Sequence, residues 1–267
     1  MRLFVCLSLF VFFIYKLDHF WFKKNHTFAL RKIYLPPIAH DPLSPPLSPL
    51  PWETICNQPF TYLNRGLQSY VFCSEDGKYI LKLFRFPSRL WVPFFSHRVE
   101  EKRELIKKAL ASYQLAWEHL RDESGLLYLQ FDTSNSFHEK ITLQDDLGFQ
   151  YKISLDRVPF LLQKRAEPFF PFLEKCIAQE GGENALRKIF NLVSSLNSHH
   201  ISDEDPILEK NYGWCEGEPI FLDVGSFCLK QDLPNACEKT TWSLKHWLSQ
   251  KHPELLQLYD KLLETYK

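Results

Sequence analysis

The sequence lacks the short motifs that mark several large enzyme classes. No G-x-S-x-G, H-E-x-x-H or G-x-x-x-x-G-K-[S/T] pattern occurs in its 267 residues. These patterns supply a serine nucleophile, a pair of zinc ligands with a general base, and a backbone cradle for phosphates. The sequence therefore gives no support to α/β-hydrolases, to zincin-type metalloproteases or to P-loop nucleotidases.

An excess of charge of either sign is also missing. The chain has 32 Lys and Arg residues against 32 Asp and Glu residues, so its formal net charge is zero. A protein that binds nucleic acid through the phosphate backbone usually shows a basic excess or a basic stripe, so we predict no nucleic-acid partner. The apolar fraction of 45% and the charged fraction of 24% are ordinary for a globular protein and exclude a wholly disordered chain.

The seven cysteines form no C-x-x-C pair and lie far apart in the sequence. An odd and unclustered set predicts free thiols in a reducing compartment, and it argues against a disulfide framework or a zinc site. The adjacent residues His199 and His200 would point apart on a strand and lie about 100° apart on a helix, which does not favour a shared metal.

The N-terminus carries an apolar run over residues 3–15, interrupted only by Ser8. As a helix, this run would cover roughly 20 Å, which is shorter than the ~30 Å hydrocarbon core of a bilayer. Extension through Phe22 reaches the required length, although Lys16, Asp18 and His19 interrupt it. No small-x-small cleavage site follows, so residues 1–24 are predicted to form an uncleaved transmembrane or signal-anchor segment. A secretion signal and an apolar helix buried in the fold are the alternatives.

The distribution of basic residues predicts an orientation for such an anchor. Only Arg2 precedes the apolar run, whereas Lys16, Lys23, Lys24 and further basic residues follow it. The positive-inside rule then places the body of the chain in the cytoplasm, as a single-pass membrane protein whose first partner is the bilayer. An exported protein is the alternative.

A proline-rich linker is predicted over residues 25–54. Between Pro36 and Pro51 the sequence is dense in proline and contains no glycine. Such a segment favours extended polyproline II and acts as a semi-rigid spacer, and an SH3-type ligand is a second interpretation. The folded domain is predicted to begin near Trp52.

The body of the chain changes from a strand pattern to a helix pattern. Short apolar runs bounded by turn residues predict strands, and Asp76-Gly77 is the strongest hairpin signal among them. These strands are predicted at residues 60–63, 69–73, 79–84, 126–131, 141–143, 149–155 and 160–163. Helices are predicted at residues 97–121, 172–179, 184–197, 241–250 and 253–266. The predicted class is α+β, with a β-rich part at 55–165 and a small α-helical part at 166–267.

Polar side chains with oxygen atoms gather in the segment from His199 to Phe227. Asp203 and Asp205 are followed by Asn211, and a short apolar run after a tight turn ends on Asp223. Carboxylate and amide oxygens are the ligands that Mg²⁺ prefers, so the pattern indicates a magnesium-nucleotide site. The alternative is that Asp203 and Asp205 belong to an acidic loop and that Asn211 and Asp223 are turn residues.

The order of elements resembles the bilobal kinase-like fold of eukaryotic-type protein kinases and aminoglycoside phosphotransferases, over about residues 55–267. Gly66, in the loop before the second strand, is similar to the loop that covers the nucleotide phosphates. Lys82 matches the strand lysine that pairs with those phosphates, and Gln163 matches the hinge beneath the adenine. The resemblance implies that ATP and Mg²⁺ are cofactors.

Asp223-Val224-Gly225 resembles the D-F-G magnesium motif, and Asn211, twelve residues earlier, resembles the catalytic-loop asparagine. In that family the catalytic base is an Asp five residues before the Asn, and Pro206 occupies this position here. Asp205 and Asp203, six and eight residues before Asn211, are therefore the two candidates for the base.

The resemblance implies a phosphotransferase that acts on an unknown protein or small-molecule acceptor. Only one glycine remains in the phosphate loop, and the base is displaced, so an inactive pseudokinase that acts as a binding or scaffold module is the first alternative. The second alternative is an unrelated α+β domain in which Lys82 and Asp223 lie apart.

Overall fold

The computed structural model describes residues 2–24, 28–34, 50–85, 96–131, 139–230 and 235–266. Its contacts divide the chain into two compact units. Unit 1 comprises residues 1–102 and 128–162, and unit 2 comprises residues 103–127 and 163–267. The predicted boundaries of the linker and of the two parts are not tested by this division and stay predictions.

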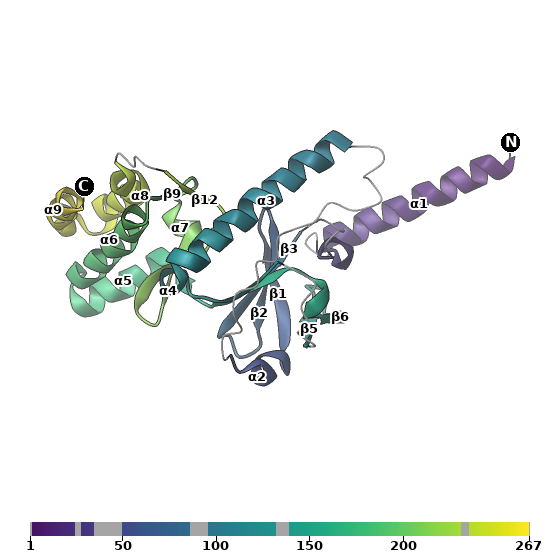
Figure 1. The fold of residues 1–267 in the computed structure, drawn as a ribbon, viewed down its shortest axis with the longest axis horizontal. Helices are drawn as coiled ribbons and strands as arrows, with labels where there is room; N and C mark the ends of the chain where they lie inside the picture. Colours follow the sequence, from purple (N-terminus) through teal and green to yellow (C-terminus); the bar gives the residue numbers. More distant parts are fainter. Residues whose placement is uncertain are drawn as a thin grey trace. The chain divides into compact units, whose positions relative to one another are not determined.

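Helix α1 (Arg2–Lys24) is the first element of unit 1 and is drawn in purple in Figure 1. Among the described residues, no helix is both long enough and apolar enough to cross a lipid bilayer. The predicted transmembrane anchor and the predicted localisation as a single-pass membrane protein with a cytoplasmic domain are therefore wrong. Lys16 and Asp18 interrupt the apolar run of α1 before it reaches the ~20 residues that a span requires.

A seven-stranded sheet forms the framework of unit 1, with the order β4-β7-β3-β2-β1-β5-β6. Its strands are β1 (Pro59–Arg65), β2 (Ser69–Ser74), β3 (Tyr79–Phe84), β4 (Leu126–Gln130), β5 (Lys140–Gln144), β6 (Gln150–Ser154) and β7 (Phe160–Lys164). Strands β1, β2 and β3 form an antiparallel meander, and β5 lies parallel to β1. Residues 81–84 of β3 are all buried, as expected for a strand in the middle of a sheet.

The turn between β2 and β3 forms because of its local sequence. The side-chain Oδ1 of Asp76 accepts hydrogen bonds from Ser74 Oγ at 2.7 Å and from the backbone N–H of Lys78 at 3.0 Å. Gly77 has a φ of 70°, a conformation that costs a glycine little. The predicted hairpin at Asp76-Gly77 is confirmed.

An aromatic cluster covers the meander and includes a residue from the segment that the sequence assigns to the linker. Phe28 is 3% exposed, and its ring lies 5.1 Å from that of Tyr70 and 5.4 Å from that of Phe72, measured between centroids. Ile33, after the short helix η1 (Leu30–Lys32), is also buried. Part of this segment thus belongs to the core of unit 1. Helix α2 (Trp52–Cys56) adds Trp52, whose ring meets that of Tyr128 edge-on at 4.9 Å.

Helix α3 (Ser96–His119) is long, as predicted, and contributes to unit 2 from residue 103 onward. It buries an apolar stripe at helical spacing, consisting of Ile106, Ala109, Leu110, Tyr113 and Ala116. The one-turn helix α4 (Arg121–Ser124) follows, and Gly125 ends it with a φ of 61°.

Helix α6 (Glu183–Ser198) packs against α5 (Phe169–Glu180), α8 (Ala236–Lys251) and α9 (Leu256–Thr265), the last preceded by η4 (Pro253–Leu255). The one-turn helix α7 (Leu208–Asn211) contacts α5 and α8. Figure 1 shows α5, α6, α8 and α9 gathered together. Phe190 of α6 contacts Tyr259 of α9, with 5.4 Å between ring centroids.

Two small sheets complete unit 2. Strands β8 (Glu167–Pro168), β10 (Tyr212–Cys215) and β11 (Glu218–Phe221) form one of them, and β9 (Ile201–Asp203) pairs with β12 (Phe227–Leu229) in the other. The predicted class is confirmed, because the structure is α+β with a β-rich first part and a small helical second part.

Candidate functional site

The hairpin of β10 and β11 brings Asn211 and Asp223 together, although twelve residues separate them in the sequence. Its first paired residues are Tyr212 and Phe221, so Asn211 and Asp223 both lie at the open end. The backbone C=O of Asn211 accepts hydrogen bonds from the N–H of Leu222 at 2.7 Å and from the N–H of Asp223 at 3.3 Å. Backbone hydrogen bonds within the hairpin, and those to the C=O of Asn211 just beyond it, therefore hold the two residues side by side.

The carboxylate of Asp223 is exposed, and one of its two oxygens accepts hydrogen bonds. Its Oδ1 accepts from the backbone N–H of Gly225 at 3.1 Å and from the hydroxyl of Tyr113 at 3.2 Å. No described residue donates to Oδ2. One oxygen of this side chain thus fixes the turn, and the other remains available to a ligand.

Helix α3 also holds the turn that contains Asp223. Ser112 is 2% exposed, and its hydroxyl donates to the C=O of Val224 and accepts from the N–H of Phe227 at 2.6 Å. The adjacent Tyr113 is buried, and its pKa is raised well above the ordinary value, first by burial and then by the charge of Asp223. Tyr113 therefore stays a neutral hydrogen-bond donor at physiological pH.

The side chain of Asn211 is 8% exposed and is oriented by Asp205. Its Nδ2 donates to the backbone C=O of Asp205 at 2.6 Å and to Oδ2 of the same residue at 3.3 Å. Because these two bonds use the amide nitrogen, Oδ1 of Asn211 is left as an acceptor to which no described residue donates. An asparagine oxygen and a carboxylate oxygen are thus both available at the open end of the hairpin.

The two candidate bases differ in their surroundings. Asp203 is 7% exposed, and it accepts from the hydroxyls of Ser226 at 2.8 Å and Tyr212 at 3.1 Å and from the N–H of Asp205 at 2.9 Å. Burial raises the pKa of Asp203, and the charge of Asp205 raises it further, although the three donors act in the opposite direction. Asp205 is exposed, and it contacts Asn211 directly.

Gly66 and Lys82, the candidate phosphate contacts, belong to unit 1. The N–H of Gly66 donates to the C=O of Ser69 at 2.9 Å, and its C=O accepts from Nη1 of Arg85 at 2.9 Å. A Cβ added at Gly66 would lie 3.5 Å from its nearest neighbour, so the loop does not require a glycine for steric reasons. Lys82 is 8% exposed and lies in β3, opposite Val71.

Gln163, the candidate hinge residue, is 1% exposed at the end of β7. Its Nε2 donates to the C=O of Ser124 at 2.7 Å and to the C=O of Phe221 at 3.1 Å. The side chain therefore ties β7 to α4 and β11 inside unit 2. A role beneath an adenine ring stays a prediction.

Sequence reasoning missed the supporting hydrogen bonds from Ser112, Tyr113 and Ser226. Ser112 and Tyr113 lie in the predicted helix at residues 97–121, and no spacing rule connects this helix with a turn more than a hundred residues later. The signal that could have found Ser112 and Tyr113 is a hydroxyl on or beside the buried face of a helix, because such groups need a partner.

Clusters that bind a metal on their own are absent from the part of the chain that the structure describes. No group of three or more His, Cys, Asp or Glu side chains is arranged there to hold a metal ion. Mg²⁺ is nevertheless often held by one or two protein oxygens, with phosphate oxygens and waters completing the octahedron. Oδ2 of Asp223 and Oδ1 of Asn211 fit that requirement chemically.

Comparisons with known proteins add little to this site. No family model matches the chain, and no curated protein matches it. A solved structure described as "ROP18 kinase domain in complex with AMP-PNP and sucrose" is similar at a TM-score of 0.38 and 11% identity, over 64% of this chain and 52% of that one. The chain thus matches about half the length of that kinase domain, and a likeness this low decides neither family nor activity.

Proposed function

We propose that the protein is a kinase-like phosphotransferase that uses magnesium-bound ATP, with the metal held at the open end of the β10–β11 hairpin. The observation that carries this proposal is the hydrogen bonding between the backbones of Asn211 and Asp223. It holds together two side chains, each with an oxygen that accepts no hydrogen bond from a described residue. The order Asp205, Asn211, Asp223 along the chain also agrees with the resemblance to the kinase-like fold.

In this proposal Oδ2 of Asp223 and Oδ1 of Asn211 hold the metal. The bound ion would supply neutralisation of the phosphate charge that develops during transfer. The chain fixes both side chains beforehand, Asp223 through Gly225 and Tyr113, and Asn211 through Asp205. Little ordering of these groups would then be required when the metal and nucleotide bind.

Asp205 is the better candidate for the general base. Its carboxylate is exposed, and it is positioned by the amide nitrogen of Asn211 at 3.3 Å, so an acceptor hydroxyl could reach it. Asp203 is buried and takes three hydrogen bonds, which suits a role in holding the loop between β9 and α7. The assignment of Gly66, Lys82 and Gln163 to nucleotide binding continues to rest on the resemblance alone.

The alternative function is an inactive pseudokinase that binds a partner or a nucleotide without turnover. The loop at Gly66 favours it, because the N–H of this single glycine already donates to Ser69. A phosphate cradle needs such backbone N–H groups to be available. The acceptor substrate, a protein or a small molecule, is left open by both functions.

The proposal is tested by thermal unfolding and by ADP release, each measured with ATP in the presence and absence of Mg²⁺. A ligand at a hundredfold excess over its Kd stabilises the folded state by about 2.7 kcal/mol, which corresponds to a rise in Tm of about 5–10 °C. We expect this rise only with Mg²⁺. Asp223→Ala should abolish this rise in Tm. Asp122→Ala, which removes another exposed Asp and serves as the control, should leave the rise unchanged.

The turnover assay separates the two functions. In an active enzyme, Asp205→Asn should retain the magnesium-dependent rise in Tm and lose ADP release, since it removes the base and keeps the side-chain shape. Stabilisation without ADP release in the unmutated protein would favour the pseudokinase. An unchanged Tm under all conditions, or a rise in Tm that persists in Asp223→Ala, would contradict the proposed metal site.

A further inference from the structure

One side chain, that of Arg85, holds the loop that contains Gly66. Arg85 directly follows strand β3, and its Nη1 donates to the C=O of Gly66 at 2.9 Å and to the C=O of Leu67 at 3.4 Å. The backbone N–H of Arg85 donates to the C=O of Gln68 at 2.8 Å. Three consecutive carbonyl groups of the loop are therefore bound by a single residue.

The guanidinium of Arg85 is itself held in place. It lies over the ring of Tyr70, 5.1 Å from the ring centroid, and Tyr70 is fully buried. The ring of Tyr70 packs edge-on against that of Phe28 in the aromatic cluster on the meander. A planar guanidinium that stacks on a ring and donates in a fixed fork loses little freedom when it binds the loop, so Arg85 provides rigid support.

The N–H groups of the loop point away from Arg85. In a trans peptide the C=O and the following N–H point in opposite directions, and none of the described peptide bonds is cis. Because Arg85 binds the C=O groups of Gly66 and Leu67, the N–H groups of Leu67 and Gln68 lie on the opposite side of the loop. Neither N–H donates a hydrogen bond to a residue that the structure describes, and Leu67 is 83% exposed. Adjacent backbone N–H groups on one side of a turn suit an anion.

We propose that Arg85 is a positioning residue, which binds the loop carbonyls and thereby presents the N–H groups of Leu67 and Gln68 to the phosphates of ATP. The inference rests on the proposed function for the identity of the anion. It assigns the shape of the loop to Arg85 and not to the glycine, because Gly66 has no positive φ and has room for a Cβ. The lack of further glycines in the loop then does not exclude phosphate binding.

The first test is an NMR titration of the isotope-labelled full chain with inorganic triphosphate in the absence of Mg²⁺. We expect saturable shifts at the amides of Leu67 and Gln68, and a smaller shift at that of Gly66, whose N–H donates to Ser69. Because the proposed metal site takes no part without Mg²⁺, Asp223→Ala should leave these shifts unchanged.

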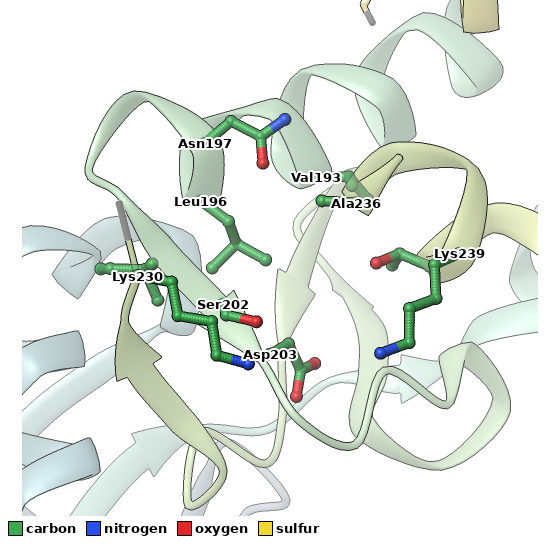
Figure 2. Close-up of a pocket in the computed structure, with 10 residues that line it drawn as sticks. Val193, Leu196, Asn197, Ser202, Asp203, Lys230, Ala236 and Lys239 are labelled. Carbon is green, nitrogen blue, oxygen red and sulfur yellow. The ribbon is translucent and has the colours of Figure 1, made fainter. Parts of the chain in front are cut away.

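A competing place for phosphate is a cavity of about 140 Å³ in unit 2, where Lys230 and Lys239 lie on either side of Asp203 (Figure 2). Lys230 is already paired with Glu204, and the carboxylate of Asp203 opposes an anion between the two lysines. We therefore expect no phosphate there, and Lys239→Gln should leave the shifts of the loop amides unchanged.

Arg85→Gln should weaken the binding of triphosphate by about tenfold, since it releases the C=O groups of Gly66 and Leu67. Arg65→Gln is the matched control. Arg65 is exposed, and its side chain forms no hydrogen bond with a described residue. It lies close to Arg85, because the pKa of Arg85 is lowered by burial and further by the charge of Arg65. Arg65→Gln and Gly66→Ala should each leave the affinity unchanged within about threefold.

Arg85→Lys tests whether the fork of donors matters. It keeps the positive charge but not the planar fork, so it should recover only part of the affinity that Arg85→Gln loses. Circular dichroism checks that each variant is folded, and Arg85→Lys serves as the second variant if Arg85→Gln does not fold.

Two results would overturn the inference. The first is an absence of shifts at Leu67 and Gln68 with triphosphate and with magnesium-bound ATP. The second is an equal loss of affinity in Arg85→Gln and Arg65→Gln, because it would indicate a general electrostatic effect. Shifts at the two amides without a magnesium-dependent rise in Tm would support the anion site in the loop and contradict the proposed metal site, so the two failures are distinguished.

Discussion

A single atom, the hydroxyl oxygen of Ser112, holds the turn of the proposed metal site. It donates to the C=O of Val224 and accepts from the N–H of Phe227, and so closes the turn that contains Asp223. We therefore develop the substitution Ser112→Ala, which removes this oxygen and keeps a small side chain that suits a helix.

The magnitude follows from the burial of the groups left behind. Ser112 is 2% exposed, so the N–H of Phe227 and the C=O of Val224 both lose their partner away from water. Each unsatisfied buried group costs about 1–3 kcal/mol, which gives a loss of at least about 2 kcal/mol in the free energy of unfolding. This is a large part of the ~5–15 kcal/mol of a typical domain.

Urea unfolding followed by circular dichroism measures this loss, with an unchanged m-value as the sign that only stability has moved. Hydrogen exchange at the amide of Phe227 should also accelerate. Ser249→Ala is the matched control, because Ser249 is an exposed helical serine whose Oγ donates to the C=O of His246 at 2.7 Å. A loss for Ser112→Ala no larger than that of the control, expected within about 0.5 kcal/mol, would refute the reasoning.

Three further outcomes are expected. Tyr113→Phe removes one hydrogen bond to the exposed Asp223 and should cost about 1 kcal/mol in the same unfolding experiment, less than Ser112→Ala. Because the pKa of Asp203 is raised, its contribution to stability is present below its unfolded pKa, about 3.9, and is lost as the pH rises through the folded value. The free energy of unfolding of the unmutated protein, minus that of Asp203→Asn, should therefore fall between pH 4 and pH 7. Urea unfolding at both pH values measures this difference, and a difference that stays constant or rises would contradict the raised pKa of Asp203. Burial raises the pKa of Cys237 to about 11, so mass spectrometry should find this thiol unlabelled by iodoacetamide in the folded protein and labelled in urea.

The elements that the sequence predicts well are those with a complete local signal. Strand β3 spans Tyr79–Phe84, as expected from its apolar run after Asp76-Gly77. Helix α6 differs from its predicted range by one residue at each end, because its apolar side chains repeat at helical spacing over four turns. Both elements need only neighbouring residues for their prediction.

The elements that were missed are short or depend on distant partners. Strand β9 has three residues and helix α7 has four, too few for a periodic pattern, and neither was predicted. Strand β9 forms because β12, over twenty residues later, pairs with it. The burial of Phe28 depends likewise on Tyr70 and Phe72, which no local rule connects to it.

For the candidate site, the sequence predicted the oxygen-bearing residues but not the hydrogen bonds that hold them in place. It predicted an oxygen-rich segment at Asp205, Asn211 and Asp223, and the structure brings these residues together in unit 2 through the hairpin. It could not rank Asp203 against Asp205, because that ranking depends on burial and on Ser226 and Tyr212 as hydrogen-bond donors.

The central claim is that Asn211 and Asp223 together hold a divalent cation bound to a nucleotide. Mn²⁺ replaces Mg²⁺ in such sites and broadens the NMR signals of nearby amides, so we propose a titration of the isotope-labelled protein with Mn²⁺ and ATP. The account predicts that the amides of Leu222, Asp223 and Gly225 broaden first, and that Asp223→Ala abolishes the effect. Broadening that is spread evenly over the exposed acidic residues, or that persists in the variant, would contradict the claim.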